Sequence, residues 1–298
     1  MKRRILYIVN PIAGNGSCTS LKELIQKHTE EAAIPYEITA SSKDSDYRSL
    51  ANKVAQENFT DIVIAGGDGT VSQAIAGLRA TGKRFAILPC GSGNGLARAA
   101  GIPLSIPKAL SLLFNGEAKL TDGMLVNGKF ACMLCGLGFD AAVAHSFSKQ
   151  PTRGLTTYVK ETIRAFSQAS PYHFKIHTDH HSLETNCLMI SVANANQYGN
   201  NVTIAPKAKL DDGLLDVVIM ADQSKLSLLI KTIRQLFGTQ AVMLPDGNSP
   251  QQKLLYWQVK NIRIENCSAA PLHIDGDPAT EVNEVNFEIL PQAFSLIR

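Results

Sequence analysis

AGGDGT, at residues 65–70, directly follows the apolar run Ile62-Val63-Ile64. Such a run is typical of a buried strand, and glycines at its end leave the backbone N–H groups uncovered. Exposed N–H groups where a strand leads into a helix form a site for phosphate oxygens. Asp68 would repel phosphate unless a cation stood between them. We therefore expect a magnesium nucleotide here, with Asp68 touching the metal and Thr70 capping the following helix.

Two further glycine-rich segments occupy the same kind of position. NPIAGNG (residues 10–16) follows the apolar RILYIVN (residues 4–10), and CGSGNG (residues 90–95) follows FAILP (residues 85–89). Neither the Walker sequence G-K-[ST] nor the dinucleotide spacing G-x-G-x-x-G occurs in these loops, which excludes both of those motifs. Three glycine-rich loops at three strand ends instead favour a different phosphate-binding site.

Strand-like and helix-like segments alternate over the first 121 residues. Helices are expected at residues 20–32, 47–58, 71–79 and 96–100. This alternation predicts a Rossmann-like α/β nucleotide domain with an open parallel sheet and ligand loops at the carboxyl ends of the strands.

After Thr121, short runs of alternating polarity dominate, as in KFACMLCG (residues 129–136) and LLDVVIM (residues 214–220). Their spacing and turn residues predict a mostly antiparallel, all-β sandwich-like domain over residues 122–292. Two helices are expected within it, at residues 155–167 and at residues 225–237, with Ser224 placed to cap the second.

Composition excludes several classes of protein. The chain has 298 residues, 45% hydrophobic and 18% charged, which is an ordinary globular composition with enough length for two cores. The net charge of +3 argues neither for nor against a nucleic-acid partner. The sequence has no stripe of Lys and Arg between aromatics, however, and this argues against such a partner. The apolar run at residues 5–9 is too short for a signal peptide, and no run approaches the roughly 18 residues of a membrane span. We expect a cytoplasmic protein.

Two segments could suggest a metal site. Cys132-Met133-Leu134-Cys135 has C-x-x-C spacing but lies in an apolar strand-like run without a second pair, which favours buried cysteines. The four histidines of HFKIHTDHH (residues 173–181) lie in a strand and a polar turn, which favours an exposed hairpin over a zinc site.

Five segments resemble, in order and spacing, the diacylglycerol kinase catalytic-domain family. They are VNPIAGNG (residues 9–16), GGDGTVSQAIAGL (66–78), LPCGSGNGLARAAGIP (88–103), APKAKLDDGLLDV (205–217) and HIDGDP (273–278). The family includes bacterial soluble lipid kinases and eukaryotic sphingosine and ceramide kinases, with NAD kinases as distant relatives. The resemblance implies a nucleotide domain at residues 1–121, to which residues 293–298 return, and a lipid-substrate domain. It also implies phosphorylation of a lipid hydroxyl, on diacylglycerol or a sphingoid-type lipid, with ATP and Mg²⁺.

The resemblance assigns site residues by position. Those expected around the ATP are Asn10, Ser41 (with Thr39 as the alternative), Gly66, Gly67, Asp68, Gly69, Thr70, Gly91, Ser92, Gly93 and Asn94. Asp275 matches the catalytic base, and Asp122 matches an aspartate that supports the base. Asp212, with the main-chain carbonyls of Leu215 and Val217, matches a structural cation site; a polar β-turn is the alternative for that segment.

A lipid hydroxyl is a poor nucleophile at neutral pH, so a positioned carboxylate that accepts its proton is useful. Asp275 follows the apolar run LHI on a tight Asp-Gly turn, which suits this role. We expect that Asp275→Asn would keep the size and hydrogen bonding of the side chain while removing the base.

Three departures from the family pattern bear on nucleotide contacts and subclass. Gly95 stands where the loop commonly has Asp, as a small residue does in sphingosine and ceramide kinases. Asp277 replaces the usual Glu of D-G-E, and Gly199-Asn200-Asn201 replaces G-G-G.

Two alternatives to a lipid kinase remain open: an NAD kinase-like kinase of a soluble metabolite, and a non-catalytic nucleotide- or lipid-binding regulator. The presence of Asp68, Asp122 and Asp275 favours catalysis. A lipid substrate implies transient contact with the inner face of a membrane. Candidate contacts with anionic lipid are Arg98, Lys149, Arg153 and Lys160. A homodimer is compatible with the sequence.

Overall fold

The computed structural model describes residues 2–12, 18–150, 155–199, 202–221 and 254–298. The chain divides into two compact units, which we call the first unit (Met1–Thr121 with Gln292–Arg298) and the second unit (Asp122–Pro291). The expected helix at residues 225–237 with its cap Ser224, and also Arg153, Asn200 and Asn201, lie outside the described residues.

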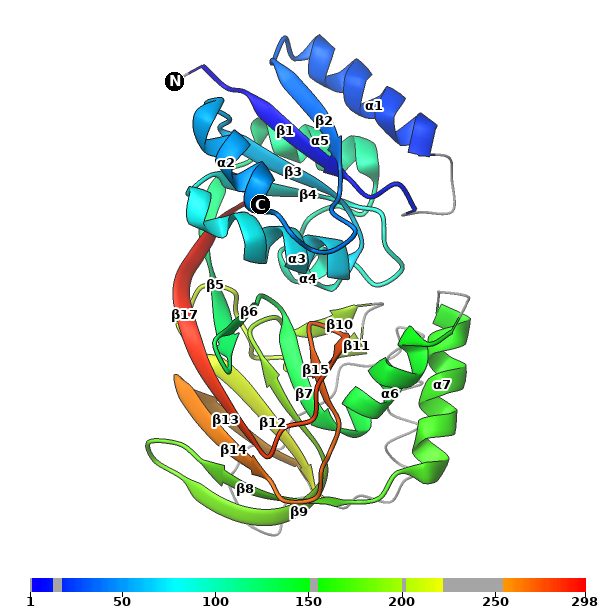
Figure 1. Ribbon diagram of the computed structural model, residues 1–298, viewed down its shortest axis with the longest axis vertical. Coiled ribbons are helices and arrows are strands. Elements are labelled where there is room, and N and C mark those ends of the chain that lie inside the picture. The colour runs from blue at the N-terminus through cyan, green and yellow to red at the C-terminus, as the bar shows by residue number, and fades with distance from the viewer. Residues whose placement is uncertain (1, 13–17, 151–154, 200–201, 222–253) are drawn as a thin grey trace. The chain divides into compact units, whose positions relative to one another are not determined.

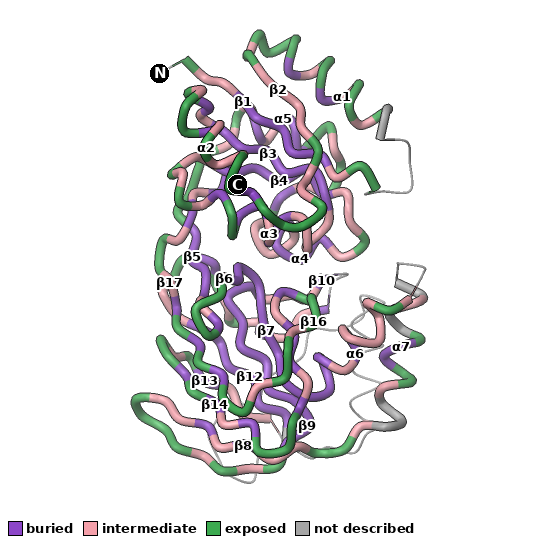
Figure 2. Tube along the Cα trace, viewed as in Figure 1, coloured by how far each residue is buried: buried purple, intermediate pink, exposed green. Residues whose placement is uncertain are grey.

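A parallel sheet with the strand order β17-β4-β3-β1-β2 forms the centre of the first unit. The strands are β1 (Ile5–Val9), β2 (Tyr36–Ala40), β3 (Asp61–Gly66), β4 (Arg84–Pro89) and the end of β17 (Glu284–Ile297). Every residue of β1 and β3 is buried, which explains why both strands read as continuous apolar runs (Figure 2). The predicted open parallel sheet is confirmed.

Helices follow the strands of this sheet in sequence (Figure 1). They are α1 (Cys18–Glu31), α2 (Arg48–Gln56), α3 (Asp68–Leu78), the 3-10 turn η1 (Arg79–Thr81), α4 (Gly95–Ala99) and α5 (Ile106–Asn115). The four helices predicted in this unit agree with α1 to α4 to within a few residues. The end of β17 forms the edge of this sheet opposite β2. It pairs with β4 at two positions, Ser295 with Arg84 and Leu296 with Phe85.

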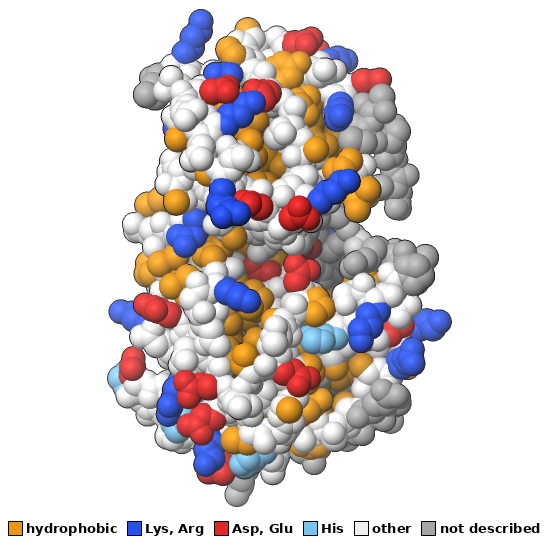
Figure 3. All heavy atoms as spheres, in the orientation of Figure 1, with side chains coloured by type: hydrophobic (Ala, Val, Ile, Leu, Met, Phe, Trp, Pro, Cys, Tyr) orange, Lys and Arg blue, Asp and Glu red, His pale blue; other side chains and the backbone are white. Residues whose placement is uncertain are grey.

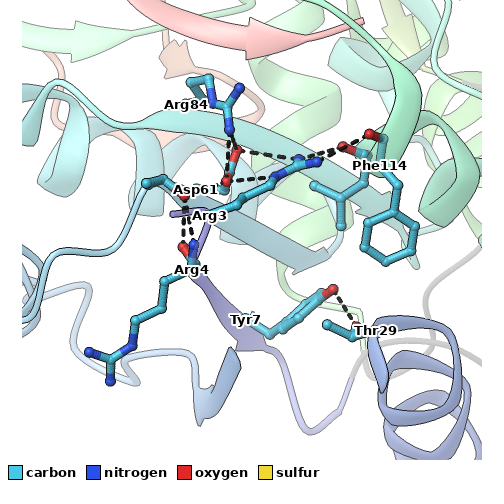
Figure 4. Close-up of polar contacts among 9 residues, drawn as sticks. Arg3, Arg4, Tyr7, Thr29, Asp61, Arg84 and Phe114 are labelled. Carbon is cyan, nitrogen blue, oxygen red and sulfur yellow. Dashed lines mark hydrogen bonds and ion pairs between the residues drawn. The ribbon is translucent and has the colours of Figure 1, made fainter. Parts of the chain in front are cut away.

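A buried carboxylate joins the starts of three strands at the edge opposite the glycine loops (Figure 4). Asp61, at the start of β3, is fully buried and contacts Arg3 Nε at 3.0 Å and Arg84 Nη2 at 2.8 Å. The hydroxyl of Thr60 donates to the same carboxylate, and Arg3 also donates to the carbonyl of Phe114 in α5. Because buried charges require partners, this cluster fixes β1, β3, β4 and α5 at one point.

The second unit is β-rich, and its main strand order is β16-β15-β7-β9-β8-β14-β17, with β12 paired to both β9 and β13. The strands are β5 (Ala118–Val126, which begins in the first unit), β6 (Lys129–Ala131), β7 (Leu134–Gly138), β8 (Tyr172–His177), β9 (Ser182–Ala193), β10 (Gln197–Gly199), β11 (Val202–Thr203), β12 (Leu215–Ala221), β13 (Leu254–Val259), β14 (Asn261–Asn266), β15 (Leu272–Ile274) and β16 (Asp277–Ala279). The strands β7, β8, β9, β12, β13, β14, β15 and β16 all pair with their neighbours in antiparallel fashion. This confirms the predicted β-rich half. Phe174, Ile190, Trp257 and Phe287 belong to its main apolar core.

Two helices accompany these strands, α6 (Phe139–Ser148) and α7 (Leu155–Gln168). The sequence predicted α7 but not α6. The first turn of α6 is buried, with Phe139, Asp140 and Ala141 all in the interior, so it lacks the one-sided apolar pattern of a surface helix. It also follows β7 directly through Gly138, whose φ of 92° requires a glycine.

The cysteine and histidine segments have the predicted local structure, buried cysteines and a hairpin. Cys132 and Cys135 are fully buried, and burial raises the pKa of the Cys135 thiol well above its usual value. HFKIHTDHH forms β8 and its turn into β9, where His180 and His181 are exposed. Within the described part of the chain, no group of three or more His, Cys, Asp or Glu side chains could hold a metal ion.

Asp61→Asn tests the anchoring cluster, because it keeps the side-chain volume but removes the charge. Hydrogen bonds to charged groups contribute about 1.5–3 kcal/mol each, so we expect the free energy of unfolding to fall by at least about 2 kcal/mol. Urea unfolding followed by circular dichroism measures the change. Asp46→Asn is the matched control, since its ion pair with Arg48 is exposed and its loss should hardly move the midpoint. Equal losses in both variants would contradict the anchoring role.

Candidate nucleotide and catalytic site

The glycine loops after β3 and β4 touch through their backbones. A Cβ added to Gly91 would lie 2.5 Å from the Cα of Gly67, and one added to Gly67 would lie 3.2 Å from the Cα of Gly91. The N–H of Cys90 donates to the carbonyl of Gly66 at 3.0 Å, which holds the loops side by side. Position 91 therefore requires glycine, whereas a side chain at position 67 would have to displace the Gly91 backbone slightly.

Side chains then tie the two loops together. Asp68 Oδ1 accepts the N–H of Gly95 at 2.6 Å, so the carboxylate of one loop caps the start of the helix in the other. Asn94, at a left-handed φ of 51°, closes the second loop upon itself: its Oδ1 accepts the N–H of Gly91 and its Nδ2 donates to the carbonyl of Gly91. Asn tolerates this backbone conformation better than most residues.

Thr70 does not cap the helix after β3, which corrects the sequence-based expectation. Helix α3 begins at Asp68 with Gly67 as its N-cap residue, so Thr70 already lies in the first turn. Its hydroxyl instead accepts a hydrogen bond from Asn10 Nδ2 at 2.8 Å, which joins the loop after β1 to the loop after β3. Gly66 leaves the necessary room, since a Cβ there would lie 2.8 Å from the Thr70 Cβ.

The structure brings most of the expected nucleotide residues together at the carboxyl ends of the parallel strands. Asn10, the segment 66–70 and the segment 91–94 follow β1, β3 and β4, which are neighbours. Ser41 follows β2 at the same end, and its N–H donates to the carbonyl of Val9. Thr39, the alternative, lies inside β2 opposite Ile8.

This donor set fits a phosphate with a cation beside it. The first helical bond of α3 runs from the N–H of Val71 to the carbonyl of Gly67, so Gly69 and Thr70 lie in the first turn, where N–H groups lack intrahelical acceptors. A helix start of this kind attracts phosphate oxygens, and the Asp68 carboxylate supplies the oxygen ligand that Mg²⁺ prefers.

Asp275 is held by the backbone of a distant segment. Its Oδ1 accepts the N–H groups of Met133 and Leu134 at 2.9 and 3.1 Å, and its Oδ2 accepts the N–H of Cys132 at 2.9 Å. The N–H of Asp275 donates in return to the carbonyl of Leu134. Asp275 has a left-handed φ of 49°, so this network also stabilises a backbone conformation that is unfavourable for a non-glycine residue.

Asp275→Asn would therefore not preserve the hydrogen bonding, contrary to the sequence-based expectation. Both carboxylate oxygens accept backbone N–H groups, and the amide NH₂ of an asparagine would oppose at least one of them.

Asp122 is connected to the same segment through Asn194, a residue that sequence reasoning missed. Asn194 Nδ2 donates to the carbonyls of Asp122 and Cys132 at 2.9 and 3.0 Å, and the N–H of Cys132 reaches Asp275. Asp122 is buried and its Oδ2 accepts the N–H of Gly213 at 2.8 Å. The one local signal for Asn194 is a polar residue at the end of the apolar run in residues 187–193.

Asp212 lies on an exposed turn, where its Oδ1 accepts the N–H of Leu214 at 3.1 Å. Leu215 and Val217 lie in β12, between the paired strands β9 and β13. The neighbouring Asp216 is fully buried, and burial raises the pKa of its carboxyl to about 6, with Tyr256 and Gln258 donating to it. The cation site at Asp212 stays a prediction.

The basic residues expected to contact lipid lie in both units. Lys149 and Lys160 are exposed, at the end of α6 and on α7, and Figure 3 shows Lys and Arg side chains gathered over this part of the second unit. Arg98, in α4, donates from Nε to the carbonyl of Gly93. Within the described ranges, no helix has the length and apolar character that a membrane span requires.

Comparison with known proteins identifies the family. A model described as the diacylglycerol kinase catalytic domain matches residues 4–126, and one described as the YegS C-terminal NAD kinase beta sandwich-like domain matches residues 134–298. The chain therefore belongs to the diacylglycerol kinase catalytic-domain family, in the group with a YegS-type C-terminal domain.

Individual relatives cover most of the chain. "Probable lipid kinase YegS-like" of Pseudomonas aeruginosa (strain UCBPP-PA14) is 29% identical over 267 residues, covering 88% of this chain and 84% of the relative. "Diacylglycerol kinase" of Bacillus subtilis (strain 168) is 28% identical over 284 residues, covering 93% and 90%. A solved structure of a diacylglycerol kinase from Bacillus anthracis str. Sterne has a TM-score of 0.77 at 21% identity, covering 99% and 96%, and thus shares the fold.

Gly91→Ala tests the contact between the two loops. The new Cβ would meet the Gly67 backbone, so we expect the loops to separate, the Gly95 amide to exchange its hydrogen faster, and stability to fall by about 1–3 kcal/mol. Hydrogen exchange measured by NMR reports on Gly95 directly. Gly82→Ala is the control: its φ of 65° adds strain of about 1–2 kcal/mol, but its Cβ meets nothing within 4 Å. Unchanged exchange at Gly95 in Gly91→Ala would disprove the role of the contact.

Proposed function

We propose that this protein is an ATP- and Mg²⁺-dependent lipid kinase that phosphorylates a hydroxyl group of diacylglycerol or a sphingoid-type lipid. The observation that carries the proposal is the placement of Asp68 in the first turn of α3, tied to Gly95 across two loops in backbone contact. Membership of the diacylglycerol kinase catalytic-domain family and the names of the relatives support a lipid as the acceptor.

In this proposal the first unit binds the nucleotide. The N–H groups of Gly69 and Thr70, at the start of α3, hold phosphate oxygens, and Asn10 keeps the Thr70 hydroxyl in place. Asp68 holds the cation, which supplies positive charge to the phosphoryl group during transfer.

The second unit supplies the base. As the lipid oxygen forms its bond to the γ-phosphorus and ADP leaves, the hydroxyl proton passes to Asp275. The backbone N–H groups of Cys132, Met133 and Leu134 hold this carboxylate in one orientation. A group held in this way loses little freedom when it acts.

One assay separates this proposal from its two alternatives. The purified protein is incubated with γ-labelled ATP and Mg²⁺ in the presence of diacylglycerol, sphingosine or NAD, with and without a chelator. We expect label in the lipid fraction and none with chelator. Label in NAD alone would favour a kinase of a soluble metabolite. Binding of ATP without any labelled product would favour a regulator.

The two variants Asp68→Asn and Asp68→Ala separate metal binding from loop structure. Asn keeps an oxygen that can accept the Gly95 N–H, whereas Ala removes both the oxygen and the charge. If the carboxylate holds the cation, both variants lose about 10²-fold or more in turnover. Initial rates at saturating Mg²⁺, with circular dichroism to verify folding, measure this. Near-normal turnover of Asp68→Asn would show that the side chain only joins the loops.

Asp275→Asn is expected to lower turnover by about 10²-fold or more, with ATP binding unchanged in calorimetry. Because this variant also breaks a backbone contact, it is compared with Asn194→Ala, which loosens the Cys132 segment but keeps the carboxylate. We expect Asn194→Ala to keep far more turnover. If the two variants lose equal turnover, Asp275 has a structural role and the base lies elsewhere.

We also propose that Lys149 and Lys160 attract the protein to anionic membranes. Each cation near such a surface contributes about 1 kcal/mol, so Lys149→Glu with Lys160→Glu should weaken binding to anionic vesicles at least about fivefold at low salt. Co-sedimentation measures the binding. Lys22→Glu with Lys27→Glu, both exposed on α1, make the same charge change elsewhere. Equal weakening by both pairs would contradict a specific role for α6 and α7.

A further inference from the structure

A polar cluster with a buried centre lies next to Asp275 within the second unit. It consists of Asp140, Ser191, Tyr198 and His273, and we call it the Asp140 cluster. The cluster lies over three neighbouring strands. His273 of β15 pairs with Gly136 of β7, and Gly136 pairs with Ser191 of β9. Asp140 fills the space above Gly136, since a Cβ there would lie 1.8 Å from Asp140 Oδ2.

Asp140 gathers the other members of the cluster. Its Oδ2 accepts the hydroxyls of Ser191 and Tyr198 at 2.8 and 2.6 Å, and His273 Nε2 lies 3.5 Å away. This separation allows an electrostatic contact but falls outside hydrogen-bond geometry, and His273 Nε2 has no hydrogen-bond partner among the described residues. His273 is 1% exposed, so its ring is shielded from water.

The other ring nitrogen of His273 fixes its tautomer. The N–H of Gly276 donates to His273 Nδ1 at 3.2 Å. A nitrogen that accepts a hydrogen bond carries no hydrogen itself, so the ring hydrogen is on Nε2, on the side of the Asp140 carboxylate. The negative charge of Asp140 favours this tautomer over the one with hydrogen on Nδ1.

His273 thereby contacts the turn that carries Asp275. Asp275 and Gly276 have left-handed φ values of 49° and 84°, and the N–H that reaches His273 belongs to the second of them. A buried nitrogen without a hydrogen bond costs about 1–3 kcal/mol, and an apolar side chain would fill the same space without that cost. An imidazole is therefore less favourable at this position than an apolar side chain, unless its Nδ1 is needed to accept the Gly276 N–H.

We propose that His273 and Asp140 are positioning residues: His273 Nδ1 holds the Asp275–Gly276 turn, and Asp140 holds His273 in the tautomer that can do so. The direction of the Asp275 carboxylate then depends on the Asp140 cluster as well as on the backbone of residues 132–134. The effect on catalysis rests on the proposed function, in which Asp275 is the base; the effect on the turn does not.

The structural part is tested without any substrate. NMR of the ring nitrogens should show His273 with hydrogen on Nε2 in the wild-type protein. The Gly276 amide should exchange faster in His273→Leu, and less so in His273→Asn, because the asparagine Oδ1 can take the place of Nδ1. A wild-type ring with hydrogen on Nδ1, or equal exchange at Gly276 in all three proteins, overturns the proposal.

The catalytic part is tested on the lipid that the wild-type protein phosphorylates. We expect His273→Leu to lower kcat about 10- to 100-fold while KM for ATP stays within about twofold, and His273→Asn to recover most of the loss. His145→Asn is the control, because His145 contacts the carbonyl of Leu272 but not the turn. Equal kcat in His273→Leu and His273→Asn, or an equal loss in His145→Asn, overturns the positioning role. If the wild-type protein labels no lipid, the proposed function fails, and the NMR result alone decides the inference.

Discussion

The arrangement of the glycine loops in the first unit depends on the contact between Gly67 and Gly91. The two loops meet through bare backbone, and this closeness puts the Gly95 N–H within reach of Asp68. Asp68 in turn opens α3, whose first turn carries the N–H groups expected to face phosphate. These glycines therefore serve the packing of one loop against another as well as the exposure of N–H groups.

The second unit follows a different rule, in which side-chain oxygens and amides hold the main chain. Asp275 accepts backbone N–H groups from residues 132–134, Asp122 accepts one from Gly213, and Asn194 bridges two carbonyls. Buried polar groups need such partners, so each of these side chains supports the structure whatever else it does. A loss of activity on changing one of them has to be weighed against the local unfolding that the same change produces.

Local patterns were sufficient for much of the fold. Apolar runs and glycines predicted the parallel strands and the loops that follow them, because both signals depend on neighbouring residues. The cap of α3 was predicted wrongly because Thr70 bonds Asn10, which lies 60 positions away. The donors to Asp275 lie 141 to 143 positions away. Contacts between residues so far apart produce no periodic pattern in the sequence. The contacts of Asn194 and of the Asp140 cluster could not be predicted for the same reason.

Strand β17 has a consequence for the protein while it is being synthesised. It pairs with β14 first and with β4 near its end, through Ser295 and Leu296. A ribosome delivers the chain from its N-terminus, so β1 to β4 emerge long before the strand that completes their sheet. Until then, one side of β4 has unpaired N–H and C=O groups, which is the kind of edge on which nascent chains aggregate. The β17–β4 pairing of the first unit can therefore form only after residues 295 and 296 have been synthesised.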